Sequence, residues 1–146
     1  MAPWADALYA MDRAWWREHI AEVRETFRGA LWAPCAGLAG VKRIRFHRQT
    51  PRNSGAGAIA LAAQMGAERI VLLGYDAQKT DGRAHWHGDH PKGLGNAGSV
   101  AKWPEQFRAL VGSLRGAQVI NASRATALTC FPRASLEDAL GVGRLQ

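Results

Sequence analysis

The most informative part of the sequence is Asn53–Gln78, which reads NSGAGAIALAAQMGAERIVLLGYDAQ. Its first half, Ser54–Met65, is small and apolar nearly all round, which predicts a helix that packs closely on a sheet. Gly66 is expected to supply the C-cap of this helix. Ile70–Leu73 then follows without polar alternation, so it predicts a strand that is buried on both faces, as in the centre of a parallel sheet.

The flanking segments continue this alternation of strands and helices. Strands are expected at Ala5–Met11, Ala30–Ala33, Val41–His47 and Val119–Ile120, and helices at Arg13–Phe27, from about Ser99 or Pro104 to Arg115, and at Leu136–Leu140. Asp12 and Ser135 are expected to cap the first and last helices. Val41–His47 alternates between apolar and basic residues, as a strand near a sheet edge does. We therefore predict a single α/β domain over residues 1–146, built as a three-layer, open, mainly parallel sheet.

The composition is that of a globular protein, with 47% hydrophobic and 21% charged residues. No apolar run approaches the roughly 18 residues that span a bilayer, and Asp6 and Asp12 interrupt the order expected of a secretion signal. We therefore expect no membrane partner and a cytoplasmic location. Cys35 and Cys130 have no partner at C-x-x-C spacing, so both are expected to be reduced and buried.

The net charge of +7 is concentrated in one part of the chain. No carboxylate lies between Glu25 and Glu68, whereas six basic residues do: Arg28, Lys42, Arg43, Arg45, Arg48 and Arg52. One interpretation is a solvated basic face, and the other is an anionic partner. A small phosphate-containing ligand is favoured over nucleic acid, because Phe46 is the one aromatic residue interleaved with these charges.

A turn of four residues separates the basic strand from the small-residue helix: Arg52, Asn53, Ser54 and Gly55. A helix start offers unpaired N–H groups and the positive end of a dipole, and glycine permits close approach to the backbone. The turn is therefore a candidate phosphate-binding site. The alternative is plain helix capping with close packing, and the pattern matches no complete nucleotide-binding fingerprint.

Polar residues also follow two of the predicted strands. Asp76 comes after the central strand, where a sugar hydroxyl, a metal or an acceptor would be held, although it could equally cap a loop. Asn121 and Ser123 follow the last strand and are further candidate ligand-binding residues. Ser123 has no identifiable base, so we do not expect it to be a nucleophile.

The long segment after Asp76 lacks periodicity and is expected to be functional. It carries three of the five histidines, His85, His87 and His90, which we expect on the carboxyl-end face of the sheet within reach of Asp76. A substrate-binding or acid–base role is favoured over metal binding, and a merely structured loop is the third possibility. With Asp76 they are the candidate catalytic residues. No metal ligands and no cofactor are assigned.

Four stretches across the chain resemble a family of small phage- and prophage-encoded proteins: PWADALYAMDRAWW, the central stretch above, HWHGDHP and VINASRATALTCFPRASLEDAL. Asn53–Asp76 is more distantly similar to the Rossmann-like family of archaeal pterin pyrophosphokinases and bacterial sialyltransferases. There an N-S-G or T-S-G turn lies near the donor nucleotide, and a strand ending in G-x-D lines the site. The resemblance implies a nucleotide at Asn53, Ser54 and Gly55, and a Rossmann-like sheet without the first strand that such relatives carry.

Three functions follow as hypotheses. The first is a phage-type, transferase-like domain that binds a nucleotide, nucleotide sugar or other phosphate ester. The second is a non-catalytic accessory or binding protein with a degenerate Rossmann-like fold. The third is a metal-dependent hydrolase that uses the His85–His90 loop.

Overall fold

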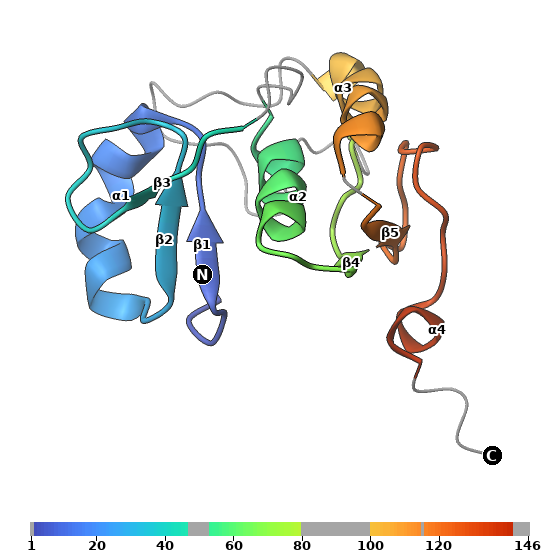
Figure 1. Cartoon of the computed structure of the whole chain (residues 1–146), viewed down its shortest axis with the longest axis horizontal. Helices are drawn as coiled ribbons and strands as arrows, with labels where there is room; N and C mark the ends of the chain where they lie inside the picture. The colour runs from blue at the N-terminus through green and yellow to red at the C-terminus, as the bar shows by residue number, and fades with distance from the viewer. Residues whose placement is uncertain (1, 47–52, 80–99, 115, 142–146) are drawn as a thin grey trace.

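The computed structural model describes residues 2–46, 53–79, 100–114 and 116–141. Strands lie at Ala7–Tyr9 (β1), Ala30–Ala33 (β2), Lys42–Arg43 (β3), Arg69–Leu72 (β4) and Gln118–Asn121 (β5). The α-helices are Arg13–Thr26 (α1), Ser54–Gln64 (α2), Trp103–Leu110 (α3) and Leu136–Leu140 (α4), with 3-10 helices Val100–Lys102 (η1) and Val111–Ser113 (η2) on either side of α3. All pairs of these strands are parallel, so the chain is mixed α/β as expected (Figure 1).

The first sheet has the strand order β1-β2-β3, with Tyr9 in register with Trp32 and Trp32 in register with Lys42. β3 therefore lies at the edge of this sheet, as the alternation of Val41–His47 predicts, but its ladder is limited to two residues. Ile44 continues the contact by donating its N–H to Ala33 C=O at 2.9 Å, and its side chain is buried. His47 lies outside the described residues.

Helix α1 covers this sheet with the apolar stripe expected from its sequence. Trp16, Val23 and Phe27 are buried with Ala10 and Ala33, and the Trp16 indole N–H donates to the Ala10 carbonyl at 3.0 Å. The predicted cap is only half correct. Asp12 occupies the N-cap position in an extended conformation, yet its side chain makes no capping hydrogen bond.

The second sheet consists of β4 and β5, paired from Arg69↔Gln118 to Leu72↔Asn121. The expectation that Ile70–Leu73 is central is wrong for the described strands, which form two hydrogen-bonded sheets. Asn121 also forms a parallel bridge with Arg133, so β5 has backbone partners on both sides and β4 has one. Burial ends with the strand. Leu72, the last residue of β4, is 2% exposed, whereas Leu73, the next residue, is 58% exposed. An apolar run signals burial but carries no information on strand neighbours.

Helices α2 and α3 enclose the core of this second sheet. Its buried residues are Ala56, Ile59, Ala60, Leu72, Phe107, Leu110, Leu114, Val119, Leu128 and Phe131. The spacing of Phe107, Leu110, Val111 and Leu114 predicts one buried stripe, but Val111 is 43% exposed. The helix tightens into η2 at this point, and the shorter period of a 3-10 helix turns Val111 out of the stripe.

Helix α2 lies between the two sheets in Figure 1 and contacts both β1 and β4. Its small residues permit this close packing. A Cβ at Gly57 would stand 2.4 Å from the Tyr9 hydroxyl oxygen, so a larger residue fits only if the Tyr9 side chain moves. The helix ends as predicted, with Met65 at the C-cap and Gly66 at a positive φ of 92°.

The remaining local predictions are mostly correct. Ser135 caps α4, because its Oγ accepts a hydrogen bond from Asp138 N–H at 3.0 Å. Cys35 and Cys130 are not bonded to each other, and both are half-buried where buried thiols were expected. Among the described helices, none combines the length and apolarity needed to cross a bilayer.

Candidate ligand-binding pocket

A pocket of about 900 Å³ lies at the carboxyl ends of β4 and β5. The in-register pairing of Leu72 with Asn121 brings the two strands to an end at the same edge, and the chain before and within α4 closes the other side. Its lining residues are Leu73, Gly74, Asp76, Ala122, Ser123, Arg124, Ala125, Arg133, Ala134, Ser135, Leu136 and Glu137. Two residues expected to form a site, Asp76 and Ser123, are therefore brought together.

Ser123 is 5% exposed and sits where the two strand ends are tied together. Its Oγ accepts a hydrogen bond from Tyr75 N–H at 2.8 Å, and its own N–H donates to Asn121 Oδ1 at 3.0 Å. Asn121 is fully buried and does not line the pocket. The structure thus places Asn121 behind Ser123, as a support for the residue that faces the cavity.

Thr126 completes this support, although nothing in the sequence analysis singled it out. Its hydroxyl donates to Tyr75 C=O at 2.6 Å and accepts from Asn121 Nδ2 and Leu128 N–H, both at 3.1 Å. One side chain therefore connects the segment after β4 with the segment after β5. A threonine five residues beyond a strand carries no periodic signal, which is why only the structure reveals it.

The hydroxyl hydrogen of Ser123 is available to a ligand. A serine hydroxyl has one donor hydrogen and can accept as well. Tyr75 N–H occupies the acceptor side of Oγ, and no described residue accepts the Ser123 hydroxyl hydrogen. Because Ser123 lines the pocket, this hydrogen is a donor for an oxygen atom placed there.

Two arginines supply positive charge to the same pocket. Arg133 donates from Nη2 to the carbonyl oxygens of Ser123 and Arg124, both at 3.0 Å, and these bonds fix the plane of its guanidinium group. Its Nε and Nη1 donors make no hydrogen bond to described residues. The Arg124 side chain is exposed and makes no hydrogen bond or ion pair with the described part of the chain. Neither arginine was a predicted site residue: Arg124 directly follows Ser123 in the sequence, whereas the contact of Arg133 with Ser123 spans ten residues.

Two carboxylates also line the pocket. Asp76 is half-buried, and its backbone carbonyl accepts from Ala127 N–H at 2.7 Å, which holds its position at the pocket wall. Glu137 reaches the pocket from the first turn of α4. Leu73 and Leu136 add apolar surface, since they are 58% and 37% exposed. The pocket therefore offers donors, acceptors and an apolar face.

At the turn that starts α2, the polar side chain of Asn53 binds other parts of the protein and does not line the pocket. Asn53 caps the helix by accepting from Ala56 N–H at 3.2 Å, and its Nδ2 donates to Gln106 Oε1 at 3.2 Å. A Cβ at Gly55 would stand 3.0 Å from the Tyr75 ring and 3.1 Å from the Phe107 ring, so close packing accounts for this glycine. Ser54 is exposed, and none of these three turn residues lines the pocket.

Tyr75 connects the turn to the pocket. Its hydroxyl donates to Gly55 C=O at 3.2 Å, while its backbone N–H and C=O bind Ser123 and Thr126. Burial raises the pKa of the Tyr75 hydroxyl to about 12. This hydroxyl therefore stays protonated over the physiological range and serves as a structural donor.

Four expected site residues, Arg52, His85, His87 and His90, lie outside the described residues. Within the described ranges, no group of three or more His, Cys, Asp or Glu side chains is arranged to hold a metal ion.

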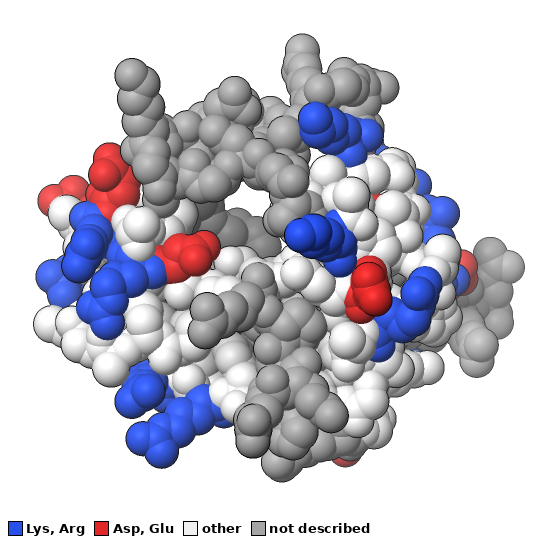
Figure 2. Space-filling model, turned by 90° about the horizontal axis from the view of Figure 1, so that it is seen from above, with Lys and Arg blue, Asp and Glu red and all other residues white. Residues whose placement is uncertain are grey.

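Arginines around the first sheet bind backbone carbonyls, and two of them, Arg28 and Arg43, belong to the basic stretch. Arg13 and Arg24 of α1 donate to Ala36 and Ala39, and Arg43 donates to Pro34, so three guanidinium groups hold the segment after β2. Lys42 lies 5.3 Å from the centroid of the Trp32 ring. The basic side chains visible in Figure 2 form several separate groups.

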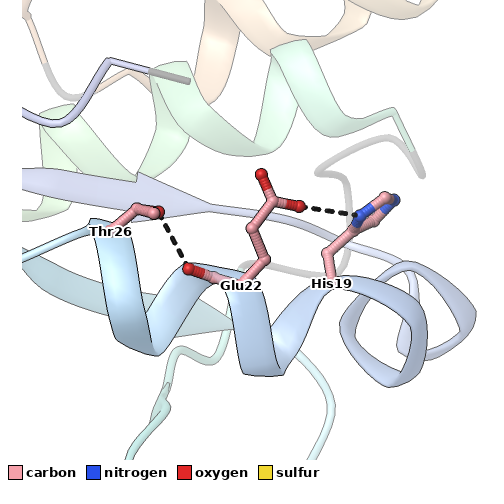
Figure 3. Close-up of polar contacts among 3 residues, drawn as sticks. All are labelled: His19, Glu22 and Thr26. Carbon is pink, nitrogen blue, oxygen red and sulfur yellow. Dashed lines mark hydrogen bonds and ion pairs between the residues drawn. The ribbon is translucent and has the colours of Figure 1, made fainter.

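Glu22 of α1 is also engaged locally. Glu22 lies 3.8 Å from His19 Nδ1, and its backbone carbonyl accepts from the Thr26 hydroxyl at 2.8 Å (Figure 3). These contacts belong to the exposed surface of α1 and are remote from the pocket lining.

Comparisons of the chain with models of known protein families, with curated proteins and with solved structures gave no significant match. Any function therefore has to be argued from the geometry of the chain itself.

Proposed function

We propose that the chain binds a nucleotide, nucleotide sugar or other phosphate ester in the pocket at the carboxyl ends of β4 and β5. One observation carries this proposal: the guanidinium of Arg133 is held by the backbone carbonyl of Ser123, and no described residue accepts the hydroxyl hydrogen of that serine, which also lines the pocket. Oriented N–H and O–H donors match phosphate oxygens, and charge-assisted hydrogen bonds contribute roughly 1.5–3 kcal/mol each. Arg124, whose side chain has no described partner, adds a second cation.

The location of the pocket supports the same proposal. Ligands of open parallel sheets bind beyond the carboxyl ends of the strands, where polar loop residues converge. In this proposal both sheets and α2 belong to one three-layer, Rossmann-like arrangement, and Asp76 faces a hydroxyl group of the ligand or of a second substrate. The resemblance to phage-encoded proteins would place this activity in the cytoplasm of a host cell.

Ligand binding is the proposed activity. Transfer of a group from the bound ligand would be a further step. The described hydrogen-bond partner of Ser123 Oγ is a backbone N–H, which cannot act as a general base. Ser123 is accordingly proposed as a ligand donor and not as a nucleophile.

Isothermal titration calorimetry with CMP, AMP and ribose 5-phosphate tests the proposal, with cytidine as the uncharged control. We expect micromolar to millimolar binding that weakens with salt and is lost for cytidine. Arg124→Ala should weaken binding about tenfold or more, and Arg133→Ala more strongly because it also frees two carbonyls.

Arg17→Ala is the matched control, because Arg17 is exposed on α1 away from the pocket. Melting curves of each variant separate lost binding from lost folding. Absence of saturable binding by all three phosphate esters would overturn the proposal, as would equal affinity of the wild type and a folded Arg124→Ala variant.

A further inference from the structure

We infer that the pocket selects a singly phosphorylated, hydroxyl-bearing ligand over di- and triphosphates, and that Glu137 determines this choice. This inference rests on the proposed phosphate-ester binding and adds the class of ligand.

The charges that line the pocket limit how much negative charge it accepts. Arg124 and Arg133 face the cavity together with Asp76 and Glu137, two charges of each sign. A phosphate monoester carries about 1.5 to 2 negative charges near neutral pH, which two guanidinium groups neutralise. Each further phosphate group adds negative charge that no lining cation remains to balance, and it meets the carboxylates instead.

Glu137 is the carboxylate whose oxygens are available to a ligand. It is exposed, and no described Lys, Arg or His forms an ion pair with it. The adjacent Asp138 differs, since its Oδ2 accepts from the Ser135 hydroxyl at 2.7 Å and its N–H is capped by the same residue. An ionised carboxylate only accepts hydrogen bonds, so Glu137 favours a ligand hydroxyl and disfavours a second phosphate.

The backbone beneath Glu137 is anchored at both ends of α4. Ser135 caps the first turn, and Arg69 Nη1 donates to Ala139 C=O at 3.4 Å from the start of β4. Ala139 is buried, so this short helix rests on the protein. The backbone that carries Glu137 is therefore held at the pocket wall.

The apolar lining fits the remaining part of such a ligand. Leu73 and Leu136 expose side-chain surface into the pocket on opposite sides, from the end of β4 and the start of α4. A sugar ring or nucleobase has carbon surface that can cover them, whereas inorganic phosphate has none. The ligand would place its phosphate at Ser123 and Arg133, its hydroxyl groups at Glu137 and its ring over the two leucines. A sugar monophosphate or a nucleoside monophosphate has all three parts.

Calorimetry with AMP, ADP and ATP in the absence of divalent cations tests this inference. We expect the wild type to bind AMP about tenfold more tightly than ATP. Glu137→Gln keeps the size of the side chain and removes its charge. The preference for AMP over ATP should therefore fall to about threefold or less in affinity, mainly because ATP binds more tightly. Glu68→Gln removes the same charge at the amino end of β4 and should leave the ratio unchanged.

Two outcomes would overturn the inference alone: ATP binding as tightly as AMP to the wild type, or an unchanged ratio in a folded Glu137→Gln variant. In both, phosphate esters still bind, so the proposed function survives. If AMP, ADP and ATP fail to bind and CMP and ribose 5-phosphate fail as well, the proposed function fails and the inference fails with it.

Discussion

The backbone N–H of Tyr75 donates a hydrogen bond to the hydroxyl oxygen of Ser123 at 2.8 Å, which joins the chain leaving β4 to the chain leaving β5. The same tyrosine reaches in the other direction, where its hydroxyl binds Gly55 C=O in the first turn of α2. The pocket floor and the start of α2 are thus parts of one hydrogen-bonded assembly.

Ser123→Ala should reduce both stability and ligand affinity. The substitution leaves Tyr75 N–H without its acceptor and removes the proposed ligand donor. An unsatisfied buried donor costs about 1–3 kcal/mol, so we expect the free energy of unfolding in urea to fall by that amount. Ser113→Ala is the control, because it removes the bond from Ser113 Oγ to Leu110 C=O without touching the pocket. A stability loss with unchanged ligand affinity would show that Ser123 has a structural role alone.

Gly57→Ala should destabilise the fold, although alanine is the better helix former. The new Cβ would lie 2.4 Å from Tyr9 Oη and 2.7 Å from the tyrosine ring, which costs about 1–3 kcal/mol by overpacking. Tyr9→Phe removes Oη, a buried atom without a described hydrogen-bond partner, and should be neutral or stabilising by itself. In a double-mutant cycle measured by urea unfolding, the variant with both substitutions should lose less stability than Gly57→Ala alone. Strict additivity would contradict this packing.

Asn53→Ala should lower stability and leave ligand affinity nearly unchanged. Loss of an Asn cap costs about 0.5–2 kcal/mol, and the bond to Gln106 is lost as well. Ser54→Ala should have little effect on stability, since Ser54 is exposed at the first position of α2. Thermal melts measure the stability of both variants, and AMP titrations measure their ligand affinity. If either substitution abolishes binding without unfolding the protein, the turn itself holds the ligand, as the sequence pattern suggested.

Stability should fall in alkaline solution through the tyrosines. Burial raises the pKa of Tyr75 from 10.0 to about 12, so the folded state favours the protonated hydroxyl. This contribution is complete below pH 10.0 and is lost as the pH rises towards about 12. Burial, with Asp12 and Cys35 nearby, also raises the pKa of Tyr9. Urea unfolding across this pH range should show the decline, and Tyr75→Phe should flatten it.

The chain has two tyrosines, which makes the titration assignable. In Tyr9→Phe, the ultraviolet absorbance of tyrosinate reports Tyr75 alone. Ionisation of Tyr75 near pH 10.0 in a folded sample would contradict its burial.

Local elements could be predicted from the sequence because their signals are local. The apolar spacing along Arg13–Thr26 and the Ser135 cap before Leu136–Leu140 each depend on residues within one or two turns. Val111 was misplaced because the sequence does not show where a helix tightens into 3-10 geometry. Strand order was misassigned for β4 because hydrophobicity reports burial and not the identity of the neighbouring strand.

The pocket could be predicted only in part, for a related reason. Asp76 and Ser123 were found because residues after parallel strands converge at one sheet edge. Arg133 and Glu137 reach the same space through the bridge between Asn121 and Arg133 and the placement of α4. These are tertiary contacts, and the residue types alone are those of any exposed surface.

Because of the arginines around the first sheet, a salt titration can distinguish ligand binding from folding. Arg13, Arg24 and Arg43 bind neutral carbonyl groups, and a bond between a cation and a neutral acceptor is screened less than the attraction between two ions. Sodium chloride should therefore displace an anionic ligand at concentrations that leave the segment after β2 in place. A single salt titration, followed by calorimetry and by circular dichroism, can thus separate electrostatic affinity from folding in the same sample.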